Sequence, residues 1–487
     1  MVWKASDMAA LKSPRVPFWV TASCDIGPFD MGDTSVAESA ILNPDGGAIG
    51  LFTTTRTVLQ SYNAVINQEF SKLLMEPVNG GKMIAVGDAS RMAKCNVIQY
   101  GRDLSENKLQ YVLLGDPALR LKYPQYTFKV EKINGGDTSS PQQVSAGSVL
   151  NVEGCVVAWD GSVANDFNGV LYSTLFDSAV DVETRDNTGL GSFSYTAYEK
   201  TLFSGSDSVR NGRFSVNMPI PMDISYSNDF GMLNFFAVDS SLVHSAQGRF
   251  DNFYIGGTSP DYSNDGKGPE IKLYLNTPEF KDGDEVNDKP CLWVELYDEN
   301  GINTIGTGIG HDIVAIVDNS PHHTYNLNSA YEPAVGDYTR GTIMMPLNTL
   351  APGEHTLLLR AWDMYNNSSV AKITFLVVPS LAPDFVSLVV NPAPVVAGST
   401  AEFVLTHNRP QCEMDVTLEI FNLQGQVLWT NTERVVCDGV AYTCKWNGEA
   451  QGGQPLPAGV YLIRGYMATD GSEMSTKTGK IVVVNNK

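Results

Sequence analysis

Two patterns of apolar and polar positions divide the chain near Pro124. Before it, short apolar runs typical of strands alternate with a stretch whose apolar residues recur at helical spacing. The runs "PFWVTASC", "GAIGLFTTT" and "LQYVLLGDPALRLKYP" predict strands, and "SYNAVINQEFSKLLM" predicts a helix. Strands that alternate with helices indicate an α/β domain with a parallel sheet, here over residues 1–124.

The two helical stretches of this region carry further signals. In "SYNAVINQEFSKLLM" the residues expected on one helical stripe are Tyr62, Val65, Ile66, Phe70, Leu73 and Leu74. In "GDTSVAESAIL" we expect a helix capped by Asp33 or Thr34, with Glu38 at the position of a capping box.

After Pro124 the apolar residues alternate with polar ones, which is typical of antiparallel strands with one buried face. Examples are "SVLNVEGCVVAW" and "GMLNFFAVDS" in residues 125–258, and "CLWVELYDENG" and "HTLLLRAWDMYNNSSVAKITFLVV" in residues 259–383. The polar stretch "GGTSPDYSNDGKGP" separates these two regions. Residues 384–487 repeat the alternation, so the pattern predicts three successive β-sandwiches.

The last region permits a more detailed prediction. In "VTLEIFNLQGQVLWT" we expect Val416, Leu418 and Ile420 to face one side, with a Gln-Gly turn before the next strand. Trp446 and Tyr461 are the expected core anchors, and the final strand is a candidate sheet edge for partner recognition. For Gly459 we expect a positive φ or close packing, so that Gly459→Val costs more than about 1 kcal/mol.

Composition and charge exclude some classes of protein. The chain has 487 residues, 43% of them hydrophobic, and a formal net charge of −21. Nucleic acids and anionic membrane surfaces are therefore poor partners for the chain as a whole. No apolar run reaches the length of a membrane helix, and the N-terminus lacks the apolar core of a signal peptide.

The seven cysteines are too few for a disulfide scaffold. Cys437 and Cys444 leave two interpretations open: a disulfide across a hairpin in an oxidising compartment, or two free thiols on neighbouring strands.

Metal-binding signals are weak, and we expect no cofactor. The adjacent His322 and His323 lack the rest of a ligand set. The loop with Asp261, Asn264 and Asp265 offers oxygens for a structural calcium ion, but its spacing is not that of an EF-hand, and a solvated linker is the simpler interpretation.

Cys24 is the candidate for catalysis. It follows the run from Val16 to Thr21, whose composition predicts a buried parallel strand. The sites of open parallel sheets form beyond the ends of such strands, and the neighbours Ala22 and Ser23 are small. A lone cysteine at such a place is either core filling or a nucleophile. Cys95 lies in a predicted helix or its flank, and the other five cysteines lie in the β regions.

Residues 16–124 resemble the gingipain-type cysteine peptidase family. The resemblance is carried in order by "PFWVTASCDIGPFD", "DTSVAESAIL", "GGAIGLFTTTRTVLQSYNAVINQEF" and "YVLLGDPALRLKYP". It implies an incomplete caspase-like parallel α/β sheet, Cys24 as the nucleophile, and a contribution of its backbone N–H to an oxyanion hole. The segment from Thr53 to Tyr62 matches the lining of the specificity pocket, with Thr54, Thr55 and Tyr62 as the substrate-binding candidates.

The family's general base is a histidine upstream of the cysteine, and no residue here matches it. All six histidines lie downstream: His244, His311, His322, His323, His355 and His407. We therefore expect the chain to be the C-terminal part of a longer protein. Without an imidazole partner a thiol is mostly protonated at neutral pH, so the isolated chain should be a poor peptidase or none.

The C-terminus resembles the signal domain of the type IX secretion system. The matching segments are "VNPAPVVAGSTAEFVL", "VTLEIFNLQGQVLW", "KWNGEAQGGQPLPAGVYLIRG" and "KTGKIVVVN". Together, the two resemblances point to the PorU-type sortases of that system. They imply an outer-membrane-associated cell-surface enzyme, exported through the periplasm, that removes C-terminal signal domains from secreted cargo, with a shuttle protein of the PorV type as partner.

The expected fold class is thus α/β plus all-β: part of a caspase-like domain (1–124), then three Ig-like β-sandwiches (125–258, 259–383 and 384–487). Two other functions remain open. One is a secreted gingipain-like protease, and the other is a non-catalytic surface adhesin or scaffold with a decayed peptidase domain.

Overall fold

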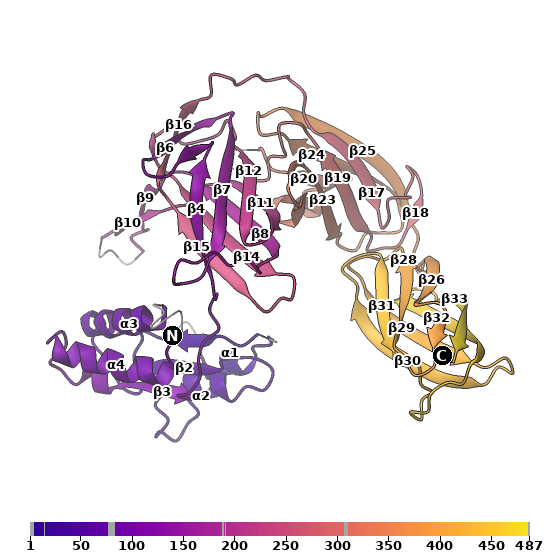
Figure 1. Ribbon diagram of the computed structural model, residues 1–487, viewed down its shortest axis with the longest axis horizontal. Coiled ribbons are helices and arrows are strands. Elements are labelled where there is room, and N and C mark those ends of the chain that lie inside the picture. The colour runs from indigo at the N-terminus through magenta and orange to yellow at the C-terminus, as the bar shows by residue number, and fades with distance from the viewer. Residues whose placement is uncertain are drawn as a thin grey trace. The chain divides into compact units, whose positions relative to one another are not determined.

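The computed structural model describes residues 4–13, 15–75, 83–187, 189, 191–305 and 310–485. The chain forms two compact units. The first comprises Met1–Thr127, Val156–Asp166 and Ser241–Gln247, and the second comprises Phe128–Cys155, Phe167–Ser240 and Gly248–Lys487. Most of the protein is β structure, and a small N-terminal part is α/β (Figure 1).

The α/β part contains a small mixed sheet. Its strands are β1 (Phe18–Val20), β2 (Gly50–Thr54) and β3 (Tyr111–Gly115), in the order β1-β2-β3. Its helices are α1 (Ala5–Ala9), α2 (Val36–Ile41), α3 (Gln60–Met75), α4 (Val86–Gln99) and the 3-10 turn η1 (Asn107–Leu109). No helix in the described part of the chain is long and apolar enough to cross a bilayer.

The direction of β3 corrects the prediction of an all-parallel sheet. β1 and β2 run parallel, as predicted, but β3 pairs antiparallel with β2. Thr54 at the end of β2 lies opposite Tyr111 at the start of β3. The two helices between these strands, α3 and α4, return the chain to the carboxyl end of β2, and β3 therefore runs back along it.

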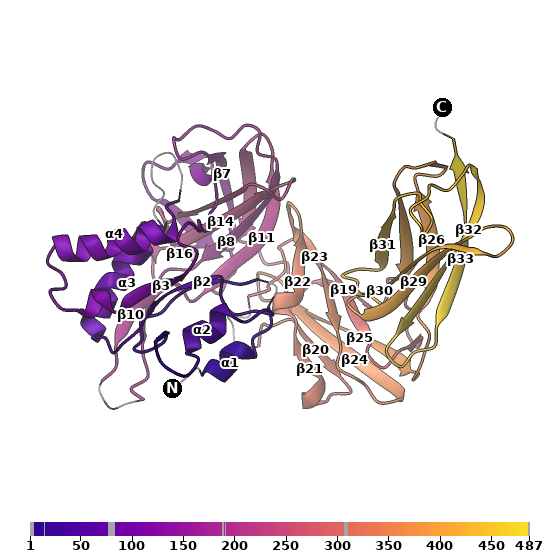
Figure 2. The ribbon, with the colours of Figure 1, turned by 90° about the horizontal axis from the view of Figure 1, so that it is seen from below.

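Helices cover both faces of this sheet (Figures 1 and 2). Phe52 packs in a cluster with α3 and α4, while its neighbour Leu51 packs in a second cluster with α1 and α2. Successive strand residues point to opposite faces, so β2 is buried along its whole length. The predicted stripe of α3 is confirmed, because Ile66, Phe70 and Leu74 are buried.

Two local expectations in this region are wrong. The helix cap is Ser35, not Asp33 or Thr34, although Glu38 does complete a capping box with it. β1 is not a buried strand: Phe18 and Trp19 are half-buried, and Val20 is 40% exposed. The reason is that β1 lies at the sheet edge, with β2 on one side only.

The first β region of the second unit has short, mostly antiparallel sheets. β8 pairs with β11 and β14, β7 pairs with β12, and β16 pairs with β13 and, in parallel, with β6. β9 and β10 form a separate hairpin. The strands are β4 (Thr127–Ile133), β5 (Gly136–Asp137), β6 (Gln142–Ala146), β7 (Val149–Val157), β8 (Gly169–Phe176), β9 (Val180–Glu183), β10 (Ser194–Ala197), β11 (Thr201–Val209), β12 (Arg213–Pro219), β13 (Asp229–Phe230), β14 (Met232–Asp239), β15 (Ser245–Phe250) and β16 (Phe253–Thr258).

The second β region is a sandwich. Its sheets, β17-β19-β23-β22 and β18-β25-β24-β20-β21, contribute side chains to one buried cluster. The elements are β17 (Glu270–Leu275), β18 (Glu285–Val286), β19 (Cys291–Tyr297), β20 (Val314–Val317), η2 (Pro321–His323), β21 (Thr324–Asn326), η3 (Asn328–Ala330), β22 (Tyr331–Ala334), β23 (Asp337–Pro346), β24 (Gly353–Trp362) and β25 (Ser368–Val377).

The third β region is also a sandwich, with sheets β26-β28-β31 and β27-β33-β32-β29-β30 around one cluster. The strands are β26 (Phe385–Asn391), β27 (Val395–Val396), β28 (Ala401–His407), β29 (Glu413–Phe421), β30 (Val427–Val436), β31 (Ala441–Trp446), β32 (Gly459–Thr469) and β33 (Ser475–Val484). The predicted face of β29 is confirmed, because Val416, Leu418 and Ile420 are all buried. Trp446 and Tyr461 are buried as predicted, and the Gln-Gly turn joins β29 to the antiparallel β30.

Two expectations for the last region change. The final strand, β33, is an edge only in part, because β27 pairs with its end at Val483 and Val484. Cys437 and Cys444 do not face each other across a hairpin, since β30 and β31 belong to different sheets. Both thiols are free and buried, and Cys444 Sγ accepts a hydrogen bond from Asn431.

The expectation for Gly459 is also wrong. Gly459 has no positive φ, and an added Cβ would meet Tyr461 at an ordinary 3.6 Å. Six residues along the same strand, a Cβ on Gly465 would lie 2.8 Å from the Phe385 ring. The close packing therefore exists at Gly465, because Phe385 of the facing sheet lies against it.

We predict that Gly465→Ala lowers the free energy of unfolding of this region by about 1–3 kcal/mol, because Phe385 must shift within a packed core. Gly459→Ala is the matched control in the same strand, and it should change stability by less than about 0.5 kcal/mol. Denaturant unfolding of the two variants measures the difference. Equal stability of the two variants would contradict the packing argument.

A buried arginine joins the second and third β regions. Arg409 is 1% exposed, and its guanidinium donates hydrogen bonds to the carbonyl oxygens of Leu381, Ala382 and Asn408. Leu381 and Ala382 belong to the link between β25 and β26. Backbone carbonyls therefore stabilise this buried cation and fasten the link to the C-terminal sandwich.

The neighbouring His407 is fully buried, and its Nδ1 accepts a hydrogen bond from the Arg409 backbone N–H. Burial, with a smaller effect of the Arg409 charge, lowers the pKa of His407 to about 4. In the unfolded chain a histidine has a pKa near 6.5. Between these two values the unfolded state binds the proton and the folded state does not.

We therefore predict that acidification from about pH 6.5 to about pH 4 lowers the free energy of unfolding of the C-terminal sandwich by roughly 2–3 kcal/mol through this residue. His407→Gln has no group that titrates there, so its stability should vary less across the same range. Denaturant unfolding at several pH values tests the difference. Parallel pH profiles for the two proteins would remove His407 as the cause.

Candidate active site

Cys24 lies in an exposed turn that follows β1. The Thr21 backbone N–H still donates to the Phe52 carbonyl at 3.0 Å, and the chain then leaves the sheet. The sequence predicted Cys24 at the end of a buried strand, but the residue is exposed. The cause is the edge position of β1, which leaves its carboxyl end open.

The segment after β2 holds this turn in place. The Gly27 N–H donates to the Thr54 carbonyl at 2.8 Å, and the Thr54 hydroxyl donates to the Ser23 carbonyl. One strand residue earlier, the hydroxyls of Thr21 and Thr53 are 2.7 Å apart. The ends of two parallel strands thus meet around Cys24, the position at which α/β sheets form sites.

The thiol itself contacts the loop after β2. Cys24 Sγ lies 3.4 Å from both the backbone N and the carbonyl O of Val58. Tyr111 is close by: burial raises its pKa to about 12, a hydrogen bond from Asn67 acts against this, and the Cys24 charge adds to it. The sequence could not predict this contact with Val58, because any residue type can make a main-chain contact.

The three predicted substrate-binding residues have different environments. Thr54 is fully buried, so its side chain supports the Cys24 turn. Thr55 is half-buried, and its hydroxyl donates to the Gln110 carbonyl at 3.1 Å. Tyr62 is half-buried in the first turn of α3. The assignment of Thr54, Thr55 and Tyr62 to substrate binding stays a prediction.

Two charged residues near the turn had not been singled out from the sequence. Arg56 forms an ion pair with Asp30, whose pKa it lowers mainly through its hydrogen bonds. Asp25, next to Cys24, has a positive φ of 52° and accepts a hydrogen bond from Thr57 at 3.1 Å. The ion pair and the Thr57 hydrogen bond both link the segment that follows Cys24 to the loop 53–58.

In the described part of the chain no histidine is hydrogen-bonded to Cys24, whose thiol makes its hydrogen bonds with the Val58 backbone. His244 makes an edge-on ring contact with Tyr126 within the first unit. In the second unit His311 and His355 contact Asp223 and Asp318, and His407 is buried. Each of these four histidines therefore has a local environment that does not include the Cys24 thiol.

The oxygens of the candidate calcium loop accept hydrogen bonds from within the protein. Asn264 Oδ1 accepts hydrogen bonds from Gly266 N and Asn367 Nδ2, and Asp265 Oδ1 accepts one from Lys267 N. Among the described residues, no group of three or more His, Cys, Asp or Glu side chains could hold a metal ion.

The arrangement around Cys24 suits a nucleophile that still needs a base. The residue is exposed, and among the described residues its backbone N–H makes no hydrogen bond to the protein. Such an N–H can donate to the oxyanion that forms when a thiolate attacks a carbonyl. The turn is held by Thr54 and Gly27, so both groups keep one geometry.

Two solved structures are reported for comparison. Dimeric latent PorU from Porphyromonas gingivalis is 28% identical, with a TM-score of 0.40, and the match covers 91% of this chain and 41% of PorU. The complex of RgpB pro- and mature domains from Porphyromonas gingivalis is 16% identical, with a TM-score of 0.23, over 52% of this chain and 49% of that one. The chain thus spans about two fifths of the length of PorU.

No curated protein matches the chain. A family model does: residues 1–122 match peptidase family C25. This match covers the α/β part described above, with Cys24, the turn that holds it and the loop after β2. Through these residues the N-terminal quarter of the chain is similar to peptidase family C25, the gingipain family.

Proposed function

We propose that this chain carries the nucleophile of a cysteine peptidase of the sortase type, which removes C-terminal signal domains from cargo of the type IX secretion system. The observation that carries the proposal is the exposed Cys24 thiol, held at the carboxyl edge of two parallel strands inside the C25 region. In this proposal the α/β part belongs to a caspase-like domain, and three Ig-like sandwiches follow it.

The proposed reaction begins with attack of the Cys24 thiolate on a peptide carbonyl. The sulfur bonds to the carbonyl carbon, the oxyanion accepts a hydrogen bond from the Cys24 N–H, and the amine leaves with a proton. Water, or an amine of a surface glycolipid, then attacks the thioester and releases the thiol. The base that takes the thiol proton is assigned to residues outside these 487, because none of the six histidines matches the family's base.

The C-terminal sandwich supports a role in type IX secretion. Its sequence resembles a type IX signal domain, and Trp446 and Tyr461 are buried in a closed two-sheet core. The proposal places the protein at the cell surface, in association with the outer membrane. Its substrates are proteins that carry such signal domains, and its partner is a shuttle protein of the PorV type.

The test uses the full-length parent protein and a reporter protein fused to a type IX signal domain. We expect release of the signal domain, seen as a mass change of the reporter, and no cleavage of the reporter without that domain. Digestion of both reporters would instead indicate a general gingipain-like protease, and digestion of neither would favour a scaffold. The mass of the mature surface protein is a second readout, because a sortase should keep its own residues 384–487.

A further inference from the structure

Cys412 and Cys437 lie opposite each other at one end of the C-terminal sandwich. The antiparallel register of β29 and β30 ends with the pair Glu413 and Val436. Continued by one residue beyond both strands, it sets Cys412 opposite Cys437. The strands remain together there, because the Gln411 N–H donates to the Cys437 carbonyl at 2.7 Å. The Gln411 side chain also donates to the Asp438 carbonyl at 2.8 Å.

The two side chains also share a face of the sheet. Met414 and Val435, one alternation inward on the two strands, both contact the core cluster, and Cys437 is part of that cluster. Cys412 directly precedes β29, and the alternation of side chains along the strand, extended by one residue, sets Cys412 on the same side as Met414. Opposite residues of an antiparallel pair have Cα atoms about 4.5–5.5 Å apart, which is within the range that a disulfide spans.

From this geometry we infer that Cys412 and Cys437 form a redox-sensitive cross-strand disulfide that closes the end of the β29–β30 hairpin. All seven cysteines are free in the structure, so the cross-link is a change that the protein can undergo. The inference does not depend on the proposed peptidase function.

The surroundings indicate which thiol reacts first. Cys412 is half-buried, and the charges of Arg409 and Lys289 counteract part of the rise in pKa that burial gives it. Cys437 is 6% exposed, and burial, then the charges of Asp438, Glu433 and Cys412, raises its pKa to about 11. Cys412 is therefore the thiol that meets an external oxidant.

The oxidant is a disulfide, either a small one such as oxidised glutathione or that of an oxidoreductase. The Cys412 thiolate attacks one glutathione sulfur, forms a mixed disulfide and releases one glutathione thiolate. The Cys437 thiolate then attacks the Cys412 sulfur and releases the second. Two electrons pass to the oxidant, and the two cysteine protons end on the two glutathione thiols.

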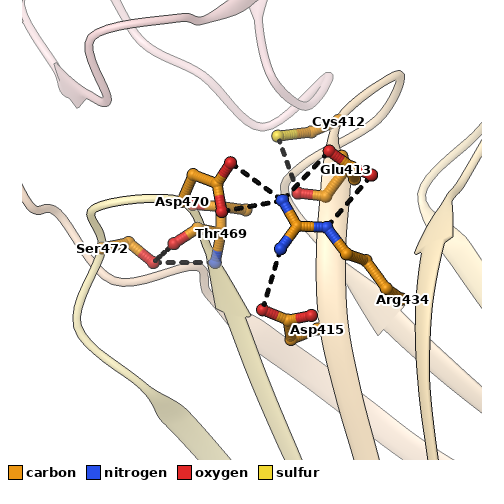
Figure 3. A network of polar contacts seen from close by, with 7 residues as sticks. All are labelled: Cys412, Glu413, Asp415, Arg434, Thr469, Asp470 and Ser472. Atoms are coloured by element: carbon orange, nitrogen blue, oxygen red, sulfur yellow. Dashed lines mark hydrogen bonds and ion pairs between the residues drawn. The ribbon is translucent and has the colours of Figure 1, made fainter.

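Ion pairs already hold these strands in register (Figure 3). Arg434 on β30 pairs with Glu413 at 3.0 Å and Asp415 at 3.6 Å on β29, and with Asp470 at 2.9 Å. Cys412 precedes Glu413, at the same end of the network. The hairpin end is thus pre-organised, and ring closure requires little further ordering.

Two other disulfides would compete with Cys412–Cys437: Cys412 with Cys291, and Cys437 with Cys444. Cys291 is near Cys412, but it lies in another sandwich and is 2% exposed. Burial raises its pKa to about 12, and the charge of Cys412 adds a smaller rise. Cys444 lies in the opposite sheet from Cys437, where its sulfur accepts the Asn431 side chain.

Tryptic mapping separates the three pairings. The reduced chain is treated with oxidised glutathione, remaining thiols are alkylated, and the unreduced digest is analysed by mass spectrometry. Cleavage places Cys412 in peptide 373–434, Cys437 and Cys444 together in 435–445, and Cys291 in 282–340. We expect 373–434 linked to 435–445, with the link retained in Cys444→Ala and Cys291→Ala and absent in Cys437→Ala.

Other results overturn the inference: an internal disulfide in 435–445, a link between 282–340 and 373–434, or no cross-link in the wild-type chain. Glutathione adducts on the exposed Cys24 and Cys95 are recognised by their mass and do not affect the result. As a second measure, the oxidised chain should show slower hydrogen exchange at the β29–β30 end than the reduced one. Cys412→Ala should show no such difference.

Discussion

Replacement of Cys24 by alanine in the full-length parent is expected to abolish cleavage of the signal-domain reporter, with a loss of at least about 10³-fold in rate. Cys24 is the exposed thiol at the carboxyl edge of the parallel pair β1–β2, and its sulfur is the atom that would bond to the substrate carbonyl. The fold should persist, because an exposed side chain in a turn contributes little to the core.

Cys95 provides the matched control. It is also exposed and free, in the same unit, but it lies on α4 within a helix rather than at a strand end. Cys95→Ala should keep the activity of the parent, and circular dichroism should show both variants folded. If Cys24→Ala retained activity, or if Cys95→Ala lost it, the nucleophile would have been assigned to the wrong residue.

Thr54 adds a graded test of the same site. Its buried hydroxyl donates to the Ser23 carbonyl and so helps to fix the turn that carries Cys24. In Thr54→Val the shape is retained and this hydrogen bond is lost. A positioning role predicts a lower kcat with little change in KM, whereas the predicted substrate-binding role requires a change in KM.

The α/β part shows which features local sequence patterns determine. The stripe with Ile66, Phe70 and Leu74 predicted α3, because helical periodicity depends only on residues a few positions apart. The direction of β3 could not be predicted from a local pattern, because it depends on how α3 and α4 return the chain to the end of β2. The exposure of Cys24 also depends on which strand neighbours β1, and no local pattern reports that neighbour.

The C-terminal sandwich shows the same limit at single residues. Alternation predicted the buried face of β29, and large aromatic side chains predicted the core anchors. Gly459 and Gly465 look alike in the sequence, and only the position of Phe385 in the facing sheet makes Gly465 the crowded one. Likewise, their seven-residue separation in the sequence suggested a pair of Cys437 with Cys444. The register of β29 with β30, which ends at Glu413 and Val436, instead leads by one further residue to Cys412 and Cys437.

Among the core anchors, Trp446 should have the largest effect on stability. It is 1% exposed, its ring lies 5.7 Å from that of Phe403 and 6.4 Å from that of Trp429, and its Nε1 donates to the Glu449 carbonyl at 2.8 Å. Trp446→Ala leaves a cavity between the two sheets and removes the partner of a backbone carbonyl. We expect the free energy of unfolding of this sandwich to fall by about 3–5 kcal/mol.

Hydrogen exchange in residues 385–484 of the whole chain measures this loss, because protection there reports the opening of this sandwich and not of the others. Trp429→Ala is the control within the same aromatic group: its side chain is only half-buried, so the loss of protection should be clearly smaller. The second sandwich, with its own core cluster, should keep its protection in both variants. Equal losses for Trp446→Ala and Trp429→Ala would show that Trp446 is not the anchor of this core, and a loss that spread to residues 270–377 would show that the two sandwiches unfold as one.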